Sequence, residues 1–455
     1  MTELGHWSME NGRISRRALL GAGGMIVAGA GLGQAVAVPG TTPVPDTPIP
    51  GTTLVPGTPV PGTPIPGAPI PGTPVPGTPV PGRAARAVRL RQDGTLLVNG
   101  APFFPFGYYY LPPPGPTGTQ VQAHMDTIRI LARAGYNAMH VSFDPGYLTN
   151  YARVCDEATR RGIYFFCTVD SAQYDPSGPE MAALIAALRN KPAIIAWSIA
   201  DDAGLHNSPN LVAPVNAAVK AADPGGLTYI SATGSANAAA YAATADLIGC
   251  QSFFVHNDRK NWAHPLSYVL PEFMQAEATA PPPAHNVIAN LQVFSWRGVE
   301  GPGTNPQARW PTATEVRNMT YQALLGGVKG ILYYTYHDSH TDIRQRPDLL
   351  QATSRLAREV TRLRTAFLGG SPLRIPVDGP WIRAGGWAYH GRAYIVVLNT
   401  APTTALPVSL ALPAGVAGPA VPLFPGQPHG LAVQGGRLRG VVAAGDVHVY
   451  SLPRH

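Results

Sequence analysis

The chain has 455 residues, of which 45% are hydrophobic and 13% are charged, and its formal net charge is +7. This hydrophobic content excludes a chain that is disordered throughout, and the length allows one large domain and a smaller one. The basic residues are scattered, and the densest group, between Arg83 and Arg91, is accompanied by no nucleic-acid-binding motif. We therefore expect no nucleic-acid partner.

The N-terminal residues 1–38 have the parts of an export signal. Arg16 and Arg17 precede a Gly- and Ala-rich apolar run, which ends in the small residues Ala35-Val36-Ala37. The arginine pair resembles the twin-arginine signal of bacterial proteins, which predicts export to the cell envelope or the medium. After cleavage near Val38 we expect no stable membrane insertion. A transmembrane anchor is the alternative, although so much Gly and Ala makes a weak spanning segment.

Residues 39–82 form a low-complexity tract. Pro, Gly, Thr and Val or Ile repeat there, with a glycine at every fifth position from Gly57 to Gly82. Proline removes amide donors and favours extended polyproline II, so the tract predicts a disordered spacer with no core of its own. Such a spacer would hold the folded part away from a surface, and the bacterial cell wall is a candidate partner.

Residues 83–370 alternate apolar runs with amphipathic stretches. Eight runs of this kind predict an α/β fold, the (β/α)8 TIM barrel, and a doubly wound sheet is the alternative. Residues 371–455 contain short alternating segments with Gly and Pro at the turns, which predicts a C-terminal β-sandwich domain. The predicted strands lie at 104–110, 135–144, 162–170, 193–202, 227–234, 246–255, 286–296 and 327–338.

Several reactive residue types have structural explanations. Three cysteines lie in apolar segments without metal or redox spacing, so we expect buried side chains, with a disulfide between Cys155 and Cys167 left open. Thr312 and Glu315 have the spacing of a helix capping box, which explains Glu315 without catalysis. The histidines near Asp338 lack a recognised metal spacing. We expect neither a metal nor a cofactor.

Three segments resemble the clan A glycoside hydrolases. Residues 93–107, DGTLLVNGAPFFPFG, resemble the segment that leads into their first strand, and residues 310–336 are similar to their last helix and eighth strand. The run KPAIIAWSIADD resembles their fourth strand, which usually ends W-x-x-x-N-E or W-x-x-x-D-E. The resemblance implies a barrel that hydrolyses glycosidic bonds, with Asp202 in the position of the catalytic acid/base and Asp201 before it.

Two departures from the family pattern concern the chemistry. Asp202 stands where the family has Glu, and Gln292 stands on the seventh strand where retaining members have a nucleophilic Glu. A neutral amide cannot accept the glycosyl group, and hydrolysis needs a second carboxyl group. Strand ends offer Asp144, Asp170 and Asp338. Asp338, across the barrel from Asp202, is preferred as the partner, and Asp170 on the neighbouring strand is the second candidate.

Aromatic and polar residues gather at the same strand ends. Aromatic faces pack against the apolar faces of sugar rings while polar groups bind the hydroxyls, so this composition favours a glycan substrate. The residues that we predict to bind substrate are Tyr108, Tyr109, Asp201, Gln292, Trp296, Tyr334 and His337. Two functions stay open: a glycoside hydrolase acting on a poly- or oligosaccharide, and a non-catalytic carbohydrate-binding barrel on a surface stalk.

Overall fold

The computed structural model describes residues 88–455, apart from 114, 145–146, 171–174, 206, 256–263, 280–285, 300 and 302. The predicted signal at 1–38 and the predicted spacer at 39–82 lie outside the described residues. No helix in the described part of the chain is long and apolar enough to cross a membrane.

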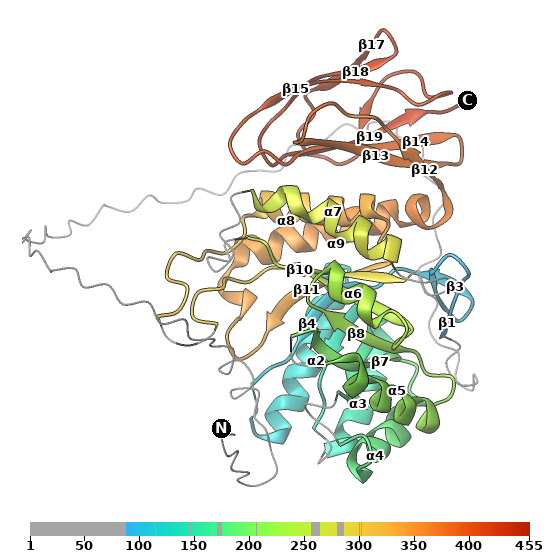
Figure 1. Cartoon of the computed structure of the whole chain (residues 1–455), viewed down its shortest axis with the longest axis vertical. Helices are drawn as coiled ribbons and strands as arrows, with labels where there is room; N and C mark the ends of the chain where they lie inside the picture. The colour runs from blue at the N-terminus through green and yellow to red at the C-terminus, as the bar shows by residue number, and fades with distance from the viewer. Residues whose placement is uncertain are drawn as a thin grey trace, which may run out of the picture. The chain divides into compact units, whose positions relative to one another are not determined.

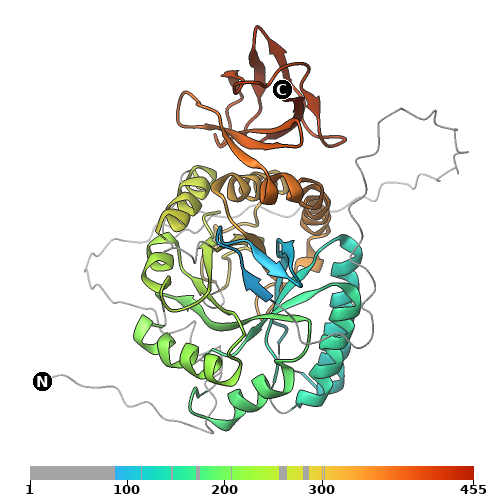
Figure 2. The same ribbon diagram turned by 90° about the vertical axis from the view of Figure 1, so that its right-hand side faces the viewer.

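Eight parallel strands close into a barrel, in the ring order β10-β11-β4-β5-β6-β7-β8-β9. Figure 2 looks into this barrel and shows the helices as an outer ring around the strands. Each predicted run matches one of the strands, with β7 extending one residue past its run, so the predicted TIM barrel is confirmed. The strands are β4 (Phe106–Tyr110), β5 (Ala138–Val141), β6 (Tyr164–Thr168), β7 (Ile194–Ala203), β8 (Thr228–Ala232), β9 (Leu247–Ser252), β10 (Val287–Gln292) and β11 (Gly330–His337).

Glycines and capping residues set several helix ends. Gly135, Gly162 and Gly327 have the left-handed conformation that ends a helix, and Thr312 with Glu315 forms the predicted capping box. The helices of the barrel domain, labelled in Figure 1, are α2 (Thr117–Ala134), α3 (Leu148–Arg161), α4 (Pro179–Leu188), α5 (Pro209–Ala222), α6 (Ser235–Tyr241), α7 (Pro265–Thr279), α8 (Ala313–Gly326) and α9 (Pro347–Gly369). The short 3-10 turn η2 (Ile343–Gln345) precedes α9.

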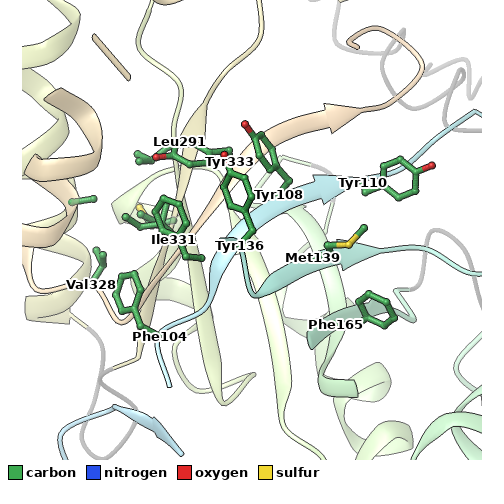
Figure 3. Close-up of a cluster of buried hydrophobic side chains, with 14 of the residues drawn as sticks. Phe104, Tyr108, Tyr110, Tyr136, Met139, Phe165, Leu291, Val328, Ile331 and Tyr333 are labelled. Carbon is green, nitrogen blue, oxygen red and sulfur yellow. The ribbon is translucent and has the colours of Figure 1, made fainter. Parts of the chain in front are cut away.

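The barrel has two buried layers because strand residues alternate between its faces. In β4, Tyr108 and Tyr110 belong to the larger cluster between strands and helices, which Figure 3 shows, whereas Tyr109 belongs to the cluster inside the barrel. The three cysteines are free and buried, and burial raises the pKa of the Cys155 thiol to about 12. These cysteines are therefore small apolar residues of the core.

A small antiparallel sheet covers one end of the barrel. It consists of β1 (Val88–Leu90), β2 (Leu96–Val98) and β3 (Ala101–Phe103), drawn in blue across the barrel in Figure 2. The turn at Asn99-Gly100 has positive φ at both residues, the geometry that favours this residue pair. Asn286, which precedes β10, donates to the carbonyl of Gly94 at 2.7 Å. Since this sheet closes the end where the strands begin, the opposite end is the open mouth.

The C-terminal residues form two antiparallel sheets, which confirms the predicted β-domain. Asn318 of α8 donates to the carbonyls of Asn399 and Gly445 at 3.0 and 2.8 Å, so its buried amide joins barrel and β-domain. One sheet has the order β12-β13-β14-β19-β16 and the other β15-β18-β17. The strands are β12 (Ser371–Arg374), β13 (Ile382–Tyr389), β14 (Arg392–Asn399), β15 (Leu406–Ala411), β16 (Val421–Pro422), β17 (Leu431–Gln434), β18 (Arg437–Val442) and β19 (Val447–Pro453).

Candidate active site

The end of β7 brings two adjacent carboxylates to the mouth of the barrel. In a regular strand, neighbouring side chains point to opposite faces. Asp202 departs from this geometry, because its φ is 51° and the register of β7 against β8 shifts between Ala200 and Ala203. Asp202 bonds Gln251 of β9, and Asp201 acts electrostatically on Tyr109 and Tyr229 inside the barrel, so both carboxyl groups lie toward the barrel interior. A non-glycine residue in this conformation is uncommon and is a feature of many functional sites.

The Asp202 carboxylate is held by a hydrogen-bond network of side-chain amides and hydroxyls. Gln251 of β9 donates from Nε2 to Asp202 Oδ1 at 2.8 Å and to the hydroxyl of Ser231 at 2.9 Å. Asn290 of β10 also donates to Ser231, at 2.9 Å. Because Ser231 and Asn290 are buried, these bonds are shielded from water and orient Gln251 toward the carboxylate.

Tyrosine hydroxyls continue this hydrogen-bond network below the mouth. The hydroxyls of Tyr109 and Tyr229 lie 3.0 Å apart, and both bond the side-chain amide of Asn290. His140 stacks on Tyr109 with ring centres 4.0 Å apart. Burial raises the pKa of both tyrosines, and the negative charge of Asp201 adds to the rise. The rings are therefore neutral hydrogen-bonding groups, and Asp201 is near enough to act on them electrostatically.

Gln292, the last residue of β10, has a different role. Its side chain is fully buried, Oε1 accepts from the Val255 amide at 2.9 Å, and Nε2 donates to the carbonyls of Val255 and Phe294 at 3.0 and 3.1 Å. The amide thus ties β10 to the segment after β9. A carboxylate here would direct oxygen against two carbonyl oxygens, and it has no proton to donate to them. This position suits an amide and not a nucleophilic Glu.

The other predicted carboxylates follow β5, β6 and β11. Asp338, the residue after β11, accepts on Oδ1 from the backbone amides of His340 and Thr341 at 2.8 and 2.7 Å. This is the loop-capping geometry of Asp, and it fixes the orientation of the carboxyl group. Asp170 is buried two residues after β6, and Asp144 is half-buried beyond β5. In the ring of strands, β11 lies opposite β7, whereas β6 is the neighbour of β7.

An aromatic wall lines the mouth on the side of β9, β10 and β11. Tyr334 lies 5.8 Å from Phe253 and 5.5 Å from Phe294, and Phe294 lies 4.9 Å from Trp296, all between ring centres. Tyr334, Phe253 and Trp296 are half-buried, so part of each ring is open to solvent. His337, also half-buried, follows on β11, and burial lowers the pKa of its imidazole. The wall offers ring faces beside polar groups, as a sugar site requires.

Tyr108 does not reach this mouth. Its side chain is fully buried between the strands and α9, where its hydroxyl donates to Thr353 at 2.6 Å. Figure 3 shows it beside Tyr333 in the outer core. The physical reason is strand alternation, which turns Tyr108 toward the helices and Tyr109 into the barrel.

Sequence reasoning missed the polar residues inside the barrel. Ser231, Gln251, Asn290 and Tyr229 interrupt apolar strands, and a polar residue at an inward-facing strand position is the signal by which they could have been found. Among the described residues, no three His, Cys, Asp or Glu side chains are grouped as a metal site.

Comparisons with known proteins agree on the fold. No protein-family model matches the chain, and no curated protein matches it in sequence. The chain is similar to a solved glycoside hydrolase family 5 structure from Bacteroides vulgatus, with a TM-score of 0.58 and 14% identity over 81% of this chain and 93% of that one.

Two amylase structures are also similar to the chain. The maltogenic α-amylase AmyB of Thermotoga neapolitana has a TM-score of 0.52 and 12% identity, over 77% of this chain and 99% of that one. The α-amylase of Geobacillus thermoleovorans has a TM-score of 0.51 and 10% identity, over 77% and 98%. At these identities the likeness establishes the fold: the chain has a TIM barrel of the kind found in glycoside hydrolases, followed by a β-domain.

Proposed function

We propose that this protein is an exported glycoside hydrolase that cleaves O-glycosidic bonds of a poly- or oligosaccharide at the mouth of the barrel. The observation that carries the proposal is the end of β7, where Asp202 has a positive φ and its carboxyl group bonds Gln251 of β9, with Asp201 beside it. Gln251, which also donates to Ser231, donates to Asp202 and orients its carboxyl group at the end of β7. An orienting network of this kind is what acid catalysis requires.

In this mechanism Asp202 is the general acid and protonates the oxygen of the leaving sugar. Because Gln292 offers an amide whose groups are bonded to backbone, β10 contributes no nucleophile. We propose that a second carboxylate activates a water on the far side of the sugar, which inverts the anomeric centre. Asp338 is our candidate for this base, since it lies on the strand opposite β7 and its loop fixes its direction. Asp170 is the second candidate.

The engaged amide of Gln292 also favours a second function, a carbohydrate-binding barrel without catalysis. The aromatic wall suits binding as well as hydrolysis, and Asp338 is partly occupied in holding its own loop. The two functions differ in one observable, because only the hydrolase releases new reducing ends from a glycan that it binds.

The test is to screen the full chain on a broad polysaccharide panel, with binding and release of reducing ends measured in parallel. On any substrate found, Asp202→Asn is expected to lower turnover at least about a hundredfold, the low end of what general acid catalysis contributes, with binding retained. Asp338→Asn keeps the loop-capping oxygen and removes the charge, so it tests Asp338 as the general base. Asp170→Asn tests Asp170, the second candidate for the base.

The exposed Asp378, in the β-domain, supplies the control Asp378→Asn, which removes an equal charge from outside the barrel. Full activity of Asp202→Asn would exclude Asp202 from catalysis. Binding without turnover by the unaltered protein would leave the carbohydrate-binding barrel as the function.

Export is part of the proposal and rests on the twin-arginine pattern of the first 38 residues. Changing Arg16 and Arg17 to Lys is expected to leave an uncleaved precursor in the cytoplasm. Normal secretion of the double variant, measured by fractionation and immunoblotting, would contradict it.

A further inference from the structure

A cavity of about 440 Å³ lies between the loops that follow β10 and β11, on the same side of the barrel as the mouth. This volume is at the small end of the range for ligand sites, enough for one sugar residue. Thr341, in its wall, donates a backbone amide to Asp338, so the wall of the cavity and the proposed base belong to one loop. Its other lining residues include Ser295, Arg297, Arg309, Trp310, His340 and Arg346.

Three arginines give the cavity its charge. Arg309 forms a bidentate pair with Glu315 at 2.7 and 2.6 Å, and Arg346 pairs with the exposed Asp348 at 3.0 and 2.7 Å. Arg297 donates to the carbonyl of Pro306 and pairs with no carboxylate in the described part of the chain. Among the described residues, Arg297 is therefore the guanidinium of this cavity that is not paired with a carboxylate.

The groups beside Arg297 suit a sugar that carries one negative charge. Trp310 is half-buried, and the guanidinium of Arg346 packs over it at 5.3 Å from the ring centre, which fixes an aromatic face beside the charge. Ser295 and His340 supply polar side chains. A guanidinium binds a carboxylate or a sulfate ester through two parallel hydrogen bonds, and one guanidinium without a described carboxylate partner matches a monoanion better than a phosphate dianion.

We propose that this cavity binds the anionic group of an acidic sugar, so that the substrate is an acidic glycan whose charged residue lies beside Asp338. This inference rests on the proposed function, since it names the substrate class of the same site. It assigns Arg297 as the residue that binds the anion, with Trp310 packing against the sugar ring.

The experiment measures binding of the full chain to matched pairs of polymers. Polygalacturonate and a glucuronan are each compared with their carboxyl-reduced, neutral forms, and a sulfated galactan is compared with its desulfated form. Affinity electrophoresis gives the Kd, and reducing-end release is recorded on the same polymers. Arg297→Gln is compared with Arg189→Gln, because Arg189 is also an exposed arginine that donates to one backbone carbonyl, that of Ala222.

We expect an acidic polymer to bind at least about tenfold more tightly than its neutral form, with Arg297→Gln removing this preference and Arg189→Gln retaining it. The carboxylate and sulfate arms identify which anion is preferred. Equal binding of charged and neutral forms, equal losses in the two variants, or no binding of any acidic polymer would overturn the inference.

Failure of the inference differs measurably from failure of the proposed function. Hydrolysis of neutral glycans that does not depend on Arg297 leaves the hydrolase proposal intact and removes the acidic substrate. Binding of an acidic polymer through Arg297 without release of reducing ends retains the cavity and removes hydrolysis.

Discussion

The ends of β7 and β10 show two uses of polar side chains in one barrel. At β7, Asp202 has an unusual backbone conformation, and Gln251 of β9 orients its carboxyl group. At β10, Gln292 is the last residue of the strand, but its amide is bonded to the backbone of Val255 and Phe294. The first arrangement leaves a carboxyl group directed at the mouth, and the second connects two segments of chain.

A residue can therefore stand at the position of a family's catalytic residue without having its catalytic role. The hydrogen-bonding partners of the side chain decide it. Gln292 makes three bonds to backbone, so its replacement is expected to affect folding, whereas replacement of Asp202 is expected to affect turnover.

The largest effect that we predict at β10 is on stability. Gln292→Glu replaces a donor of two hydrogen bonds by an oxygen facing two carbonyls, and leaving buried polar groups unsatisfied costs roughly 2–4 kcal/mol. Thermal and urea unfolding should show this loss. Gln292→Met, which removes the polar group at similar size, is the control and should be less harmful than the introduced carboxylate. A fully stable Gln292→Glu variant that also gains turnover would contradict the structural role of Gln292, because β10 would then accept a nucleophile.

A smaller effect is expected behind Asp202. Gln251→Leu removes the amide that bonds Asp202 Oδ1 and Ser231, so the carboxyl group loses its orientation. We expect kcat to fall about tenfold, which corresponds to about 1.4 kcal/mol, with KM nearly unchanged. Gln251→Asn is the conservative variant and should recover part of the loss. An unchanged kcat in Gln251→Leu would show that the network does not position Asp202.

The last prediction concerns a buried carboxyl group near the beginning of β10. Burial raises the pKa of Glu277 on α7 to about 8, with Lys329 and the backbone of Val287 acting in the opposite direction. Between the ordinary pKa of Glu and this value, unfolding releases a proton, so stability falls as the pH rises, by at most about 1.4 kcal/mol per pH unit. The melting temperature should therefore fall more steeply from pH 5 to 8 in the unaltered protein than in Glu277→Gln. Parallel curves would contradict the burial of this carboxyl group.

Much of the fold was predictable from residues near one another in the sequence. Each barrel strand is an apolar run of its own, and the turn at Asn99-Gly100 and the capping box at Thr312 follow from adjacent residues. These features depend on local backbone preference and on burial, which periodicity records.

The candidate site was only partly predictable. The carboxylates of β7 end an apolar run and could be found, but Ser231, Gln251 and Asn290 meet only when the barrel closes. Tyr108 could not be told from Tyr109 until the pleat of β4 was known. Pairing across strands that are far apart in the sequence leaves no local pattern.

The most direct test of the proposed hydrolysis is the anomeric configuration of the first sugar released, followed by proton NMR before mutarotation. Because β10 offers a backbone-bonded amide in place of a nucleophile, the account predicts inversion, with water attacking the side opposite the leaving group. Retention would require a group of the protein that forms a glycosyl intermediate, and it would contradict the division of roles between β7 and β10.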